Sequence, residues 1–206
     1  MTPPFTVLSV CMGNICRSPM SERLLVLRLR EALGTEGDRV GDFLLSHSCG
    51  LGSWHVGEGM TEATARELRE RGGTGEGFHS RQIGADKVDI SDLILTATTE
   101  QVDYIRHNHP EALERTFLVR HFGALLSHVD ADALPPFAPA PEAVQARGVA
   151  IVKAADGLRD RSAESELDDP WGLDTATYRR IGDELDETLI PFAALLTGEP
   201  GAGDRP

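Results

Sequence analysis

Residues 5–19 read FTVLSVCMGNICRSP, and this stretch decides the fold of the chain. It begins with a short apolar run rich in β-branched residues, which is typical of a parallel strand covered on both faces. Cys11 follows at the end of this run, and Arg17, Ser18 and Pro19 come shortly after it. Ser18 suits a helix N-cap, and Pro19 suits the first helical position, where no backbone donor is lost. The stretch therefore predicts a strand, a tight loop and the start of a helix.

The loop from Cys11 to Arg17 combines features that bind anions. A helix N-terminus presents unpaired N–H groups and about half a positive charge, and a tight loop before it can aim further N–H groups at the same point. The guanidinium of Arg17 adds a planar fork that matches two oxygens of a phosphate. Such a field favours the thiolate form of a cysteine. The sequence therefore predicts a phosphate cradle with a sulfur nucleophile, Cys11, at its floor.

The string CMGNICRSP, residues 11–19, resembles the phosphate-binding loop of the low-molecular-weight protein tyrosine phosphatases. The signature of that family is a cysteine, five residues, then arginine and serine, near the N-terminus after the first strand. A bare match to the cysteine and arginine spacing would be a weak signal, and its plain alternative is a buried structural cysteine beside a surface arginine. The full string, its place after an apolar strand and the Ser-Pro pair make the resemblance specific.

The resemblance implies an α/β fold of three layers, in which a four-stranded parallel sheet has helices on both faces. It predicts one domain over residues 1–198 and a flexible, polar tail at 199–206. The family's usual chain is shorter, so residues 130–148, which are rich in alanine and proline, are interpreted as a surface insertion or a lid-like loop. Four prolines argue against regular structure there, although residues 142–158 can form a helix.

Hydrophobic periodicity predicts the other elements of the fold. Strands are expected at residues 43–48, 93–97 and 116–119. Helices are expected at residues 19–33, 61–71, 99–107, 122–126 and 175–196, the last of them kinked or interrupted at Pro191. A short helix or turn is expected before the third strand, at residues 84–88.

The resemblance also assigns roles within the loop. It implies that the phosphate is bound by one continuous set of residues, Met12, Gly13, Asn14, Ile15, Cys16, Arg17 and Ser18. Ser18 would hydrogen-bond the sulfur of Cys11, and Asn14 would hold the loop in shape through local hydrogen bonds. The family further implies a reversible disulfide between Cys11 and Cys16 that shields the nucleophile from over-oxidation.

A candidate general acid lies in LDDPWG, residues 167–172. After a thiolate attacks phosphorus, the leaving group needs a proton, which a carboxylic acid above the cradle can give and later recover from water. The resembled family carries this acid as an Asp directly before Pro, followed by an aromatic residue, ahead of the last helix. Asp169 matches that pattern and is the predicted acid, with Asp168 the less favoured one. The alternative is a plain loop before the helix.

Two tryptophans are predicted to form walls of a substrate cleft. Trp54 lies in the glycine-rich stretch CGLGSWHVG, residues 49–57, and Trp171 follows the candidate acid. Together they would sandwich an aromatic ring, which favours phosphotyrosine over phosphoserine. Family members that act on phosphoarginine tend to have threonine where this chain has Ile15, which favours tyrosine further. His55 is interpreted as a structural hydrogen-bonding residue rather than a catalyst.

Composition limits the partners and the compartment. The formal net charge of −13 argues against nucleic acid or an anionic membrane as a partner. No apolar run approaches the ~20 residues of a membrane helix, and no signal-peptide pattern is evident, so a cytoplasmic location is expected. The odd number of cysteines, 3, argues against a disulfide framework. No metal or other cofactor is expected, because loop N–H groups and Arg17 supply the charge stabilisation.

These features and the resemblance predict a phosphomonoester hydrolase, specifically a protein-tyrosine phosphatase that works through a phosphocysteine, with a phosphotyrosine-containing protein or a small phosphomonoester as substrate. One alternative is an arsenate reductase-like enzyme, which needs further thiols; outside the loop the chain offers only Cys49. The other is a catalytically inactive phosphopeptide-binding module, which the complete set of Cys11, Arg17 and Asp169 argues against. The sequence leaves the oligomeric state open.

Overall fold

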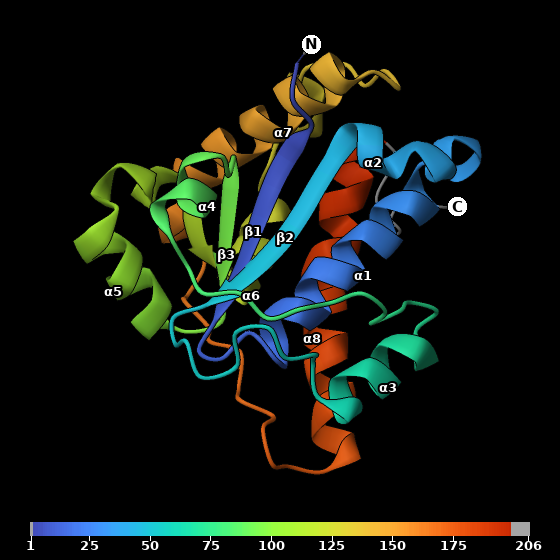
Figure 1. Cartoon of the computed structure of the whole chain (residues 1–206). Helices are drawn as coiled ribbons and strands as arrows, with labels where there is room; N and C mark the ends of the chain where they lie inside the picture. Colours follow the sequence, from blue (N-terminus) through green and yellow to red (C-terminus); the bar gives the residue numbers. More distant parts are fainter. Residues whose placement is uncertain (1, 199–206) are drawn as a thin grey trace.

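The fold is built on one parallel sheet, seen in a computed structural model that describes residues 2–198. The strands lie in the order β2-β1-β3-β4 and all run the same way. Their bounds are β1 (Phe5–Cys11), β2 (Leu44–Gly50), β3 (Leu93–Thr96) and β4 (Thr116–Leu118). Helices cover both faces of this sheet (Figure 1). The expected three-layer α/β fold is therefore confirmed.

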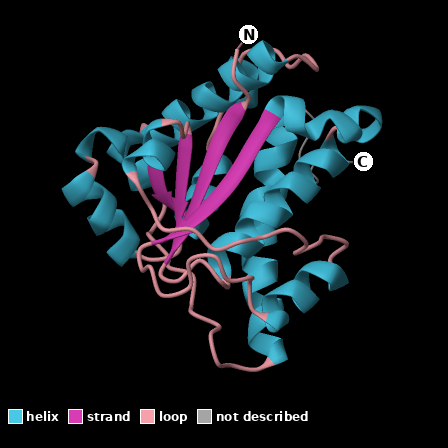
Figure 2. Cartoon of the chain, in the orientation of Figure 1, coloured by secondary structure: helices cyan, strands magenta, loops and turns pink. Residues whose placement is uncertain are grey.

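The helices account for most of the remaining chain (Figure 2). Their bounds are α1 (Arg17–Ala32), α2 (Val40–Phe43), α3 (Glu62–Glu70), α4 (Ala85–Asp89), α5 (Thr99–Asn108), α6 (Val119–Leu126), α7 (Pro141–Asp156) and α8 (Thr175–Thr197). The strands and helices expected from periodicity are all present, and most of their ends agree within two residues. The exception is α6, which begins three residues earlier than expected because its first turn continues directly from β4.

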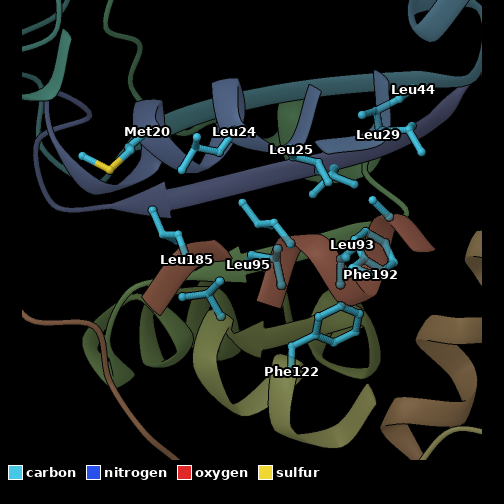
Figure 3. Close-up of a cluster of buried hydrophobic side chains, with 14 of the residues drawn as sticks. Met20, Leu24, Leu25, Leu29, Leu44, Leu93, Leu95, Phe122, Leu185 and Phe192 are labelled. Carbon is cyan, nitrogen blue, oxygen red and sulfur yellow. The ribbon is translucent and has the colours of Figure 1, made fainter. Parts of the chain in front are cut away.

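The two faces of the sheet carry separate hydrophobic cores, because side chains alternate along a strand. Phe5 and Val7 of β1 belong to the larger core, with α1, α6, α7 and α8. Leu8 and Val10 belong to the smaller core, with α4 and α5. Figure 3 shows leucines of α1 facing Leu185 and Phe192 of α8 in the larger core. Every residue of β1 is buried, so the strand that leads to the candidate site is held on both faces.

The start of α1 differs from the prediction. The helix begins at Arg17, with Cys16 at the N-cap and no side-chain cap, so Ser18 is the second helical residue and not the cap. Pro19 is the third, where its missing N–H would have had no partner within the helix anyway. Ser18 does not cap the helix because its hydroxyl lies within hydrogen-bonding distance of the Cys11 sulfur instead.

Helix α7 confirms the helix expected from residue 142, and it begins within residues 130–148, where the prolines argued against regular structure. Helix α7 begins at Pro141, in the first position, where a fixed φ suits a helix. Its residue Gly148 packs so closely on the ring of Phe5 that an added Cβ would lie 2.4 Å from the Phe5 Cδ2 atom. This contact, at the start of β1, places α7 at the end of the sheet away from Cys11, so it is not a lid (Figure 1).

Helix α8 runs without interruption through Pro191. The expected buried stripe holds it on both sides of the proline, with Leu185, Leu189 and Phe192 all buried in the larger core. Asp186 fastens the helix further, because its carboxylate accepts hydrogen bonds from Arg28 of α1 and from Arg71, the C-cap residue of α3. The C-terminal tail expected at residues 199–206 lies outside the described residues.

His47 of β2 is buried in its neutral form. Ser91 Oγ donates to the carbonyl oxygen of Lys87 at 2.6 Å, so it accepts from His47 Nε2 at 3.0 Å. Burial, reinforced by the nearby positive charges of Arg81 and Lys87, lowers the pKa of His47 from 6.5 to about 4. The folded chain therefore binds this proton more weakly than the unfolded chain does.

We expect this difference to make the free energy of unfolding fall as the pH drops from about 6.5 towards 4, because only the unfolded chain gains the proton in that window. At ~1.4 kcal/mol per pKa unit, His47 accounts for a loss on the order of 3 kcal/mol. Urea unfolding at several pH values should show a shallower slope in His47→Gln. Exposed His79 supplies the control His79→Gln, and an unchanged slope in His47→Gln would contradict the assignment.

Candidate active site

The candidate site lies where the chain order of the sheet reverses. The chain passes from β1 to β2 on one side and then to β3 on the other, and ligands of open α/β sheets bind at the carboxyl ends of the strands at such a point. Cys11 ends β1 and Arg17 begins α1. Around them is a cleft of about 360 Å³, lined by Cys11, Met12, Gly13, Ile15, Cys16, Arg17, Trp54, His55, Asp169 and Trp171.

Asn14 fixes the shape of the loop. Its φ of 55° is in the left-handed region, which asparagine tolerates better than most residues. Its fully buried side-chain amide donates to Ser18 Oγ and Ser48 Oγ, both at 2.8 Å. Its carbonyl oxygen accepts from the backbone N–H of Arg81 at 2.8 Å. These three hydrogen bonds hold a turn that would otherwise be strained.

The sulfur of Cys11 lies among hydrogen-bond donors. Its side chain is only 3% exposed. The Sγ atom accepts from the backbone N–H of Asn14 at 3.3 Å and lies 3.0 Å from Ser18 Oγ. The N-terminus of the 16-residue helix α1 is adjacent, with its positive end of the dipole. The N–H of Asn14 and the helix N-terminus stabilise negative charge on sulfur. Ser18 adds to this when its hydroxyl donates to the sulfur rather than to the carbonyl oxygen of Cys49 at 3.3 Å.

Arg17 connects the loop to the segment before α8. Its guanidinium is 5% exposed, and it donates from Nη1 to the carbonyl oxygen of Leu167 at 3.0 Å. It donates from Nη2 to Asp169 Oδ2 at 2.7 Å. The Nε–H is buried without a partner among the described residues. A guanidinium has five N–H donors and these two contacts use two of them, so further donors remain for an anion.

The two neighbouring aspartates face different surroundings. Asp169 lines the cleft, and its Oδ1 accepts from the backbone N–H of Trp171 at 3.2 Å. Asp168 instead pairs with Arg180 of α8 at 3.0 Å. The backbone just before the two aspartates is anchored next to the end of β3, because the N–H of Leu167 donates to the carbonyl oxygen of Ala97 at 2.8 Å. The structure therefore brings Asp169, but not Asp168, to the cysteine and arginine.

The predicted walls also reach the cleft. Trp54 and Trp171 both line it while remaining largely exposed, and Ile15 adds an apolar surface. His55 lines the same cleft, and its Nδ1 is 2.7 Å from Glu58 Oε2. Gly13 packs beside His55, since an added Cβ would lie 3.2 Å from the ring Cδ2 atom. A structural role for His55, holding the Trp54 loop against the phosphate loop, fits these contacts.

All three cysteines are free thiols in this structure. Cys16 Sγ lies 3.5 Å from the Tyr178 hydroxyl and 3.7 Å from Thr61 Oγ1, and burial raises the pKa of this thiol. Burial also raises the pKa of Cys49, which is wholly inside the fold. Cys16 has hydroxyl neighbours but, unlike Cys11, its sulfur accepts from no backbone N–H among the described residues, and neither does that of Cys49.

A supporting layer behind the loop was not predicted from the sequence. Glu22 of α1 is buried, accepts from Ser48 Oγ at 2.6 Å and pairs with Arg81 at 3.0 Å. Burial raises the pKa of this carboxyl, against the opposing effect of Ser48 and Arg81. Ser80, the residue before Arg81, also supports the phosphate loop, because its Oγ donates to the carbonyl oxygen of Gly13 at 3.2 Å. In sequence, Glu22, Ser48 and Ser80 belong to no motif of their own.

The described residues contain no cluster of potential metal ligands and no helix that could span a membrane. Among residues 2–198, no three His, Cys, Asp or Glu side chains gather in a way that could hold a metal ion. His109 and Glu111 approach each other only as a pair, at 3.8 Å. Over the same residues, none of the helices has the length and apolar character needed to cross a bilayer.

A parallel α/β sheet with a cysteine at the floor of an anion-binding loop and a carboxylate at its edge is the arrangement of a cysteine-dependent phosphatase. The family model described as low molecular weight phosphotyrosine protein phosphatase matches residues 6–146, and the chain belongs to this family. Asp169 lies beyond the matched residues, so its assignment rests on the geometry of the cleft.

Two relatives show how far the sequence similarity extends. The low molecular weight protein-tyrosine-phosphatase YfkJ of Bacillus subtilis is 37% identical over 101 residues, which cover 49% of this chain and 61% of the relative. The low molecular weight protein-tyrosine phosphatase A of Mycobacterium bovis is 33% identical over 122 residues, covering 59% and 69%. The match thus spans about three fifths of the first relative's length.

Solved structures extend the likeness of the fold over nearly the whole chain. The tyrosine phosphatase Wzb from Escherichia coli K30, in complex with sulphate, has a TM-score of 0.59 at 20% identity, covering 94% of this chain and 97% of its own. The YwlE arginine phosphatase from Geobacillus stearothermophilus has a TM-score of 0.61 at 22% identity, covering 92% and 91%. At such low identity these matches show the fold, and they do not distinguish tyrosine from arginine phosphatases.

Proposed function

We propose that this chain hydrolyses phosphotyrosine in proteins through a phosphocysteine intermediate. Cys11 is the nucleophile, Arg17 and the N–H groups of residues 12–18 bind the phosphate, and Asp169 is the general acid and base. The observation that carries the proposal is the meeting of Asp169 with Cys11 and Arg17 at one cleft, although Asp169 lies 152 positions beyond Arg17 in the chain. Arg17 joins the other two, since it follows the loop of Cys11 and holds Asp169 at 2.7 Å.

The first step transfers the phosphoryl group to the enzyme. The Cys11 thiolate attacks phosphorus, and the S–P bond forms as the P–O bond to the leaving group breaks. Asp169 gives its proton to the departing oxygen. Arg17 and the loop N–H groups balance the charge on the remaining phosphoryl oxygens. Only two of the five guanidinium N–H groups of Arg17 are used by Leu167 and Asp169, so others remain to bind phosphoryl oxygens.

The second step releases inorganic phosphate. Asp169, now ionised, accepts a proton from water as the water oxygen attacks phosphorus. The S–P bond breaks, and the sulfur leaves as a thiolate. Ser18, whose Oγ is 3.0 Å from the sulfur, stabilises that leaving thiolate by hydrogen bonding. The enzyme is thereby returned to its starting state without an external reductant or cofactor.

The depth of the cleft supports phosphotyrosine as the substrate. The sulfur is buried while Trp54 and Trp171 stand exposed at the mouth, so the phosphorus must be carried inward from the peptide backbone. A phenyl ring spans that depth and stacks on indoles, whereas the single methylene of phosphoserine does not. Ile15 completes an apolar lining that suits a ring better than a guanidinium.

The alternatives find less support. Arsenate reduction needs a second thiol to relay electrons, but Cys49 is buried with a raised pKa. A module that only binds phosphopeptides needs no general acid, so the carboxylate of Asp169, which Arg17 holds at the cleft, argues against this alternative. The three free thiols suit a reducing compartment such as the cytoplasm.

We expect initial rates on matched phosphotyrosine, phosphoserine and phosphoarginine peptides, measured with reductant, to favour phosphotyrosine by at least ~100-fold over phosphoserine. The reason is that only the tyrosine ring both reaches Cys11 and fills the space beside the indoles. Faster turnover of phosphoarginine would overturn the substrate assignment. Arsenate-dependent oxidation of thioredoxin would instead support the reductase alternative.

A further inference from the structure

Two short turns at the mouth of the cleft share one pattern. The first turn, residues 53–56, is closed by a hydrogen bond from the N–H of Val56 to the carbonyl oxygen of Ser53 at 3.3 Å. The second turn, residues 170–173, is closed by a bond from the N–H of Leu173 to the carbonyl oxygen of Pro170 at 2.9 Å. Each turn has a tryptophan at its second position and an aliphatic residue at its fourth.

The aliphatic residues of these turns are exposed although nothing in the catalytic chemistry uses them. Val56 and Leu173 are 54% and 57% exposed. Eight large apolar side chains are exposed among residues 2–198, and four of them lie on these two turns: Trp54, Val56, Trp171 and Leu173. Such clustering of exposed apolar surface marks an interaction site more often than chance exposure does.

Both turns are anchored by neighbouring contacts. After the first, the N–H of Gly57 donates to the carbonyl oxygen of Ser80 at 2.9 Å. After the second, Asp174 caps α8 by accepting from the N–H of Thr177 at 2.9 Å. A surface that is already ordered loses little conformational entropy on binding. The exposed aliphatic side chains are therefore presented on fixed supports.

The charges nearest the two turns do not call for a charged partner. Glu58 is engaged by His55, Asp168 by Arg180 and Asp169 by Arg17. The chain as a whole has a formal net charge of −13, which disfavours acidic segments of a substrate. The exposed apolar side chains themselves gain most from contact with apolar side chains of a partner.

We propose that Val56 and Leu173 are specificity-determining residues, which contact apolar side chains on either side of the phosphotyrosine in a protein substrate. This inference rests on the proposed function, because the occupant of the surface is the polypeptide that carries the phosphotyrosine into the cleft. The surface is continuous with the cleft, because Trp54 and Trp171 belong to the same two turns and line the cleft.

The test compares two phosphotyrosine peptides, one with leucine and one with glycine on both sides of the phosphotyrosine. The parent chain is expected to show about tenfold higher kcat/KM for the leucine peptide, mainly through KM. The double variant Val56→Ser, Leu173→Ser should reduce that ratio to near one. Its kcat/KM for p-nitrophenyl phosphate should stay within about twofold of the parent, because so small a substrate does not extend beyond the cleft.

The matched control is Ile90→Ser, Ile190→Ser, which removes two exposed aliphatic side chains that do not line the cleft. It should keep the parent's preference for the leucine peptide. The inference is overturned if the active parent shows no preference, or if the Val56 and Leu173 variant keeps it. Inactivity of the folded parent on every phosphotyrosine substrate would instead overturn the proposed function, and the inference with it.

Discussion

Replacement of Cys11 by serine is expected to abolish hydrolysis of p-nitrophenyl phosphate, with a loss on the order of 10⁴-fold or more. A serine hydroxyl of similar size still reaches Ser18 and the N–H of Asn14. However, a hydroxyl is a much weaker acid than a thiol and a poorer nucleophile when protonated, so the attack on phosphorus fails. Initial rates with reductant present measure the effect, and circular dichroism checks that the variant is folded.

Cys49→Ala is the control for the loss of a thiol as such. Cys49 is buried in β2, outside the phosphate loop, and its sulfur has no part in the proposed mechanism. This variant should keep turnover within a few-fold of the parent. Near-normal hydrolysis by Cys11→Ser would refute the assignment of the nucleophile.

Replacement of Asp169 by asparagine is expected to lower kcat for phenyl phosphate by ~10²–10⁴-fold. The amide cannot give a proton to the leaving phenolate or take one from water. The loss should be smaller in the phosphoryl-transfer step with p-nitrophenyl phosphate, because p-nitrophenolate is a weaker base that leaves without full protonation. Burst kinetics with the two substrates separates this step from hydrolysis of the intermediate.

Asp168→Asn provides a control one residue away. It removes the same charge from the same loop but breaks only the exposed pair with Arg180. Exposed pairs contribute little to stability, so the loop should keep its structure without this pair. Turnover should therefore change by no more than about threefold. Equal losses in the two variants would mean that loop charge, and not proton transfer by Asp169, sets the rate.

Much of the fold could be predicted because its signals are local. The strand from Phe5, the loop and the leucine-rich helix α1 are contiguous in sequence, and each has its own periodicity. The family resemblance of the same stretch then implied the parallel sheet. Asp169 was predicted from its neighbour Pro170 and its place before the last helix, and the structure puts it in the cleft of Cys11.

Other features depend on contacts that no local pattern encodes. Ser18 looks like a helix cap until the sulfur of Cys11 is placed beside it. The pairing of Arg17 with Asp169 joins residues 152 positions apart. Glu22 looks like a solvated residue of α1, yet the fold buries it behind the loop. The prolines around residue 140 suggested irregular structure because Pro141 favours a helix only if it occupies the first position.

The most direct test is to trap the phosphoryl group on the enzyme. In Asp169→Asn, water is no longer deprotonated efficiently, so the intermediate formed from p-nitrophenyl phosphate should accumulate. Acid quenching followed by peptide mapping with mass spectrometry should find one phosphoryl group on Cys11. A phosphoryl group on any other residue, or continued turnover with no covalent phosphoenzyme, would contradict a thiolate attack from the floor of the loop.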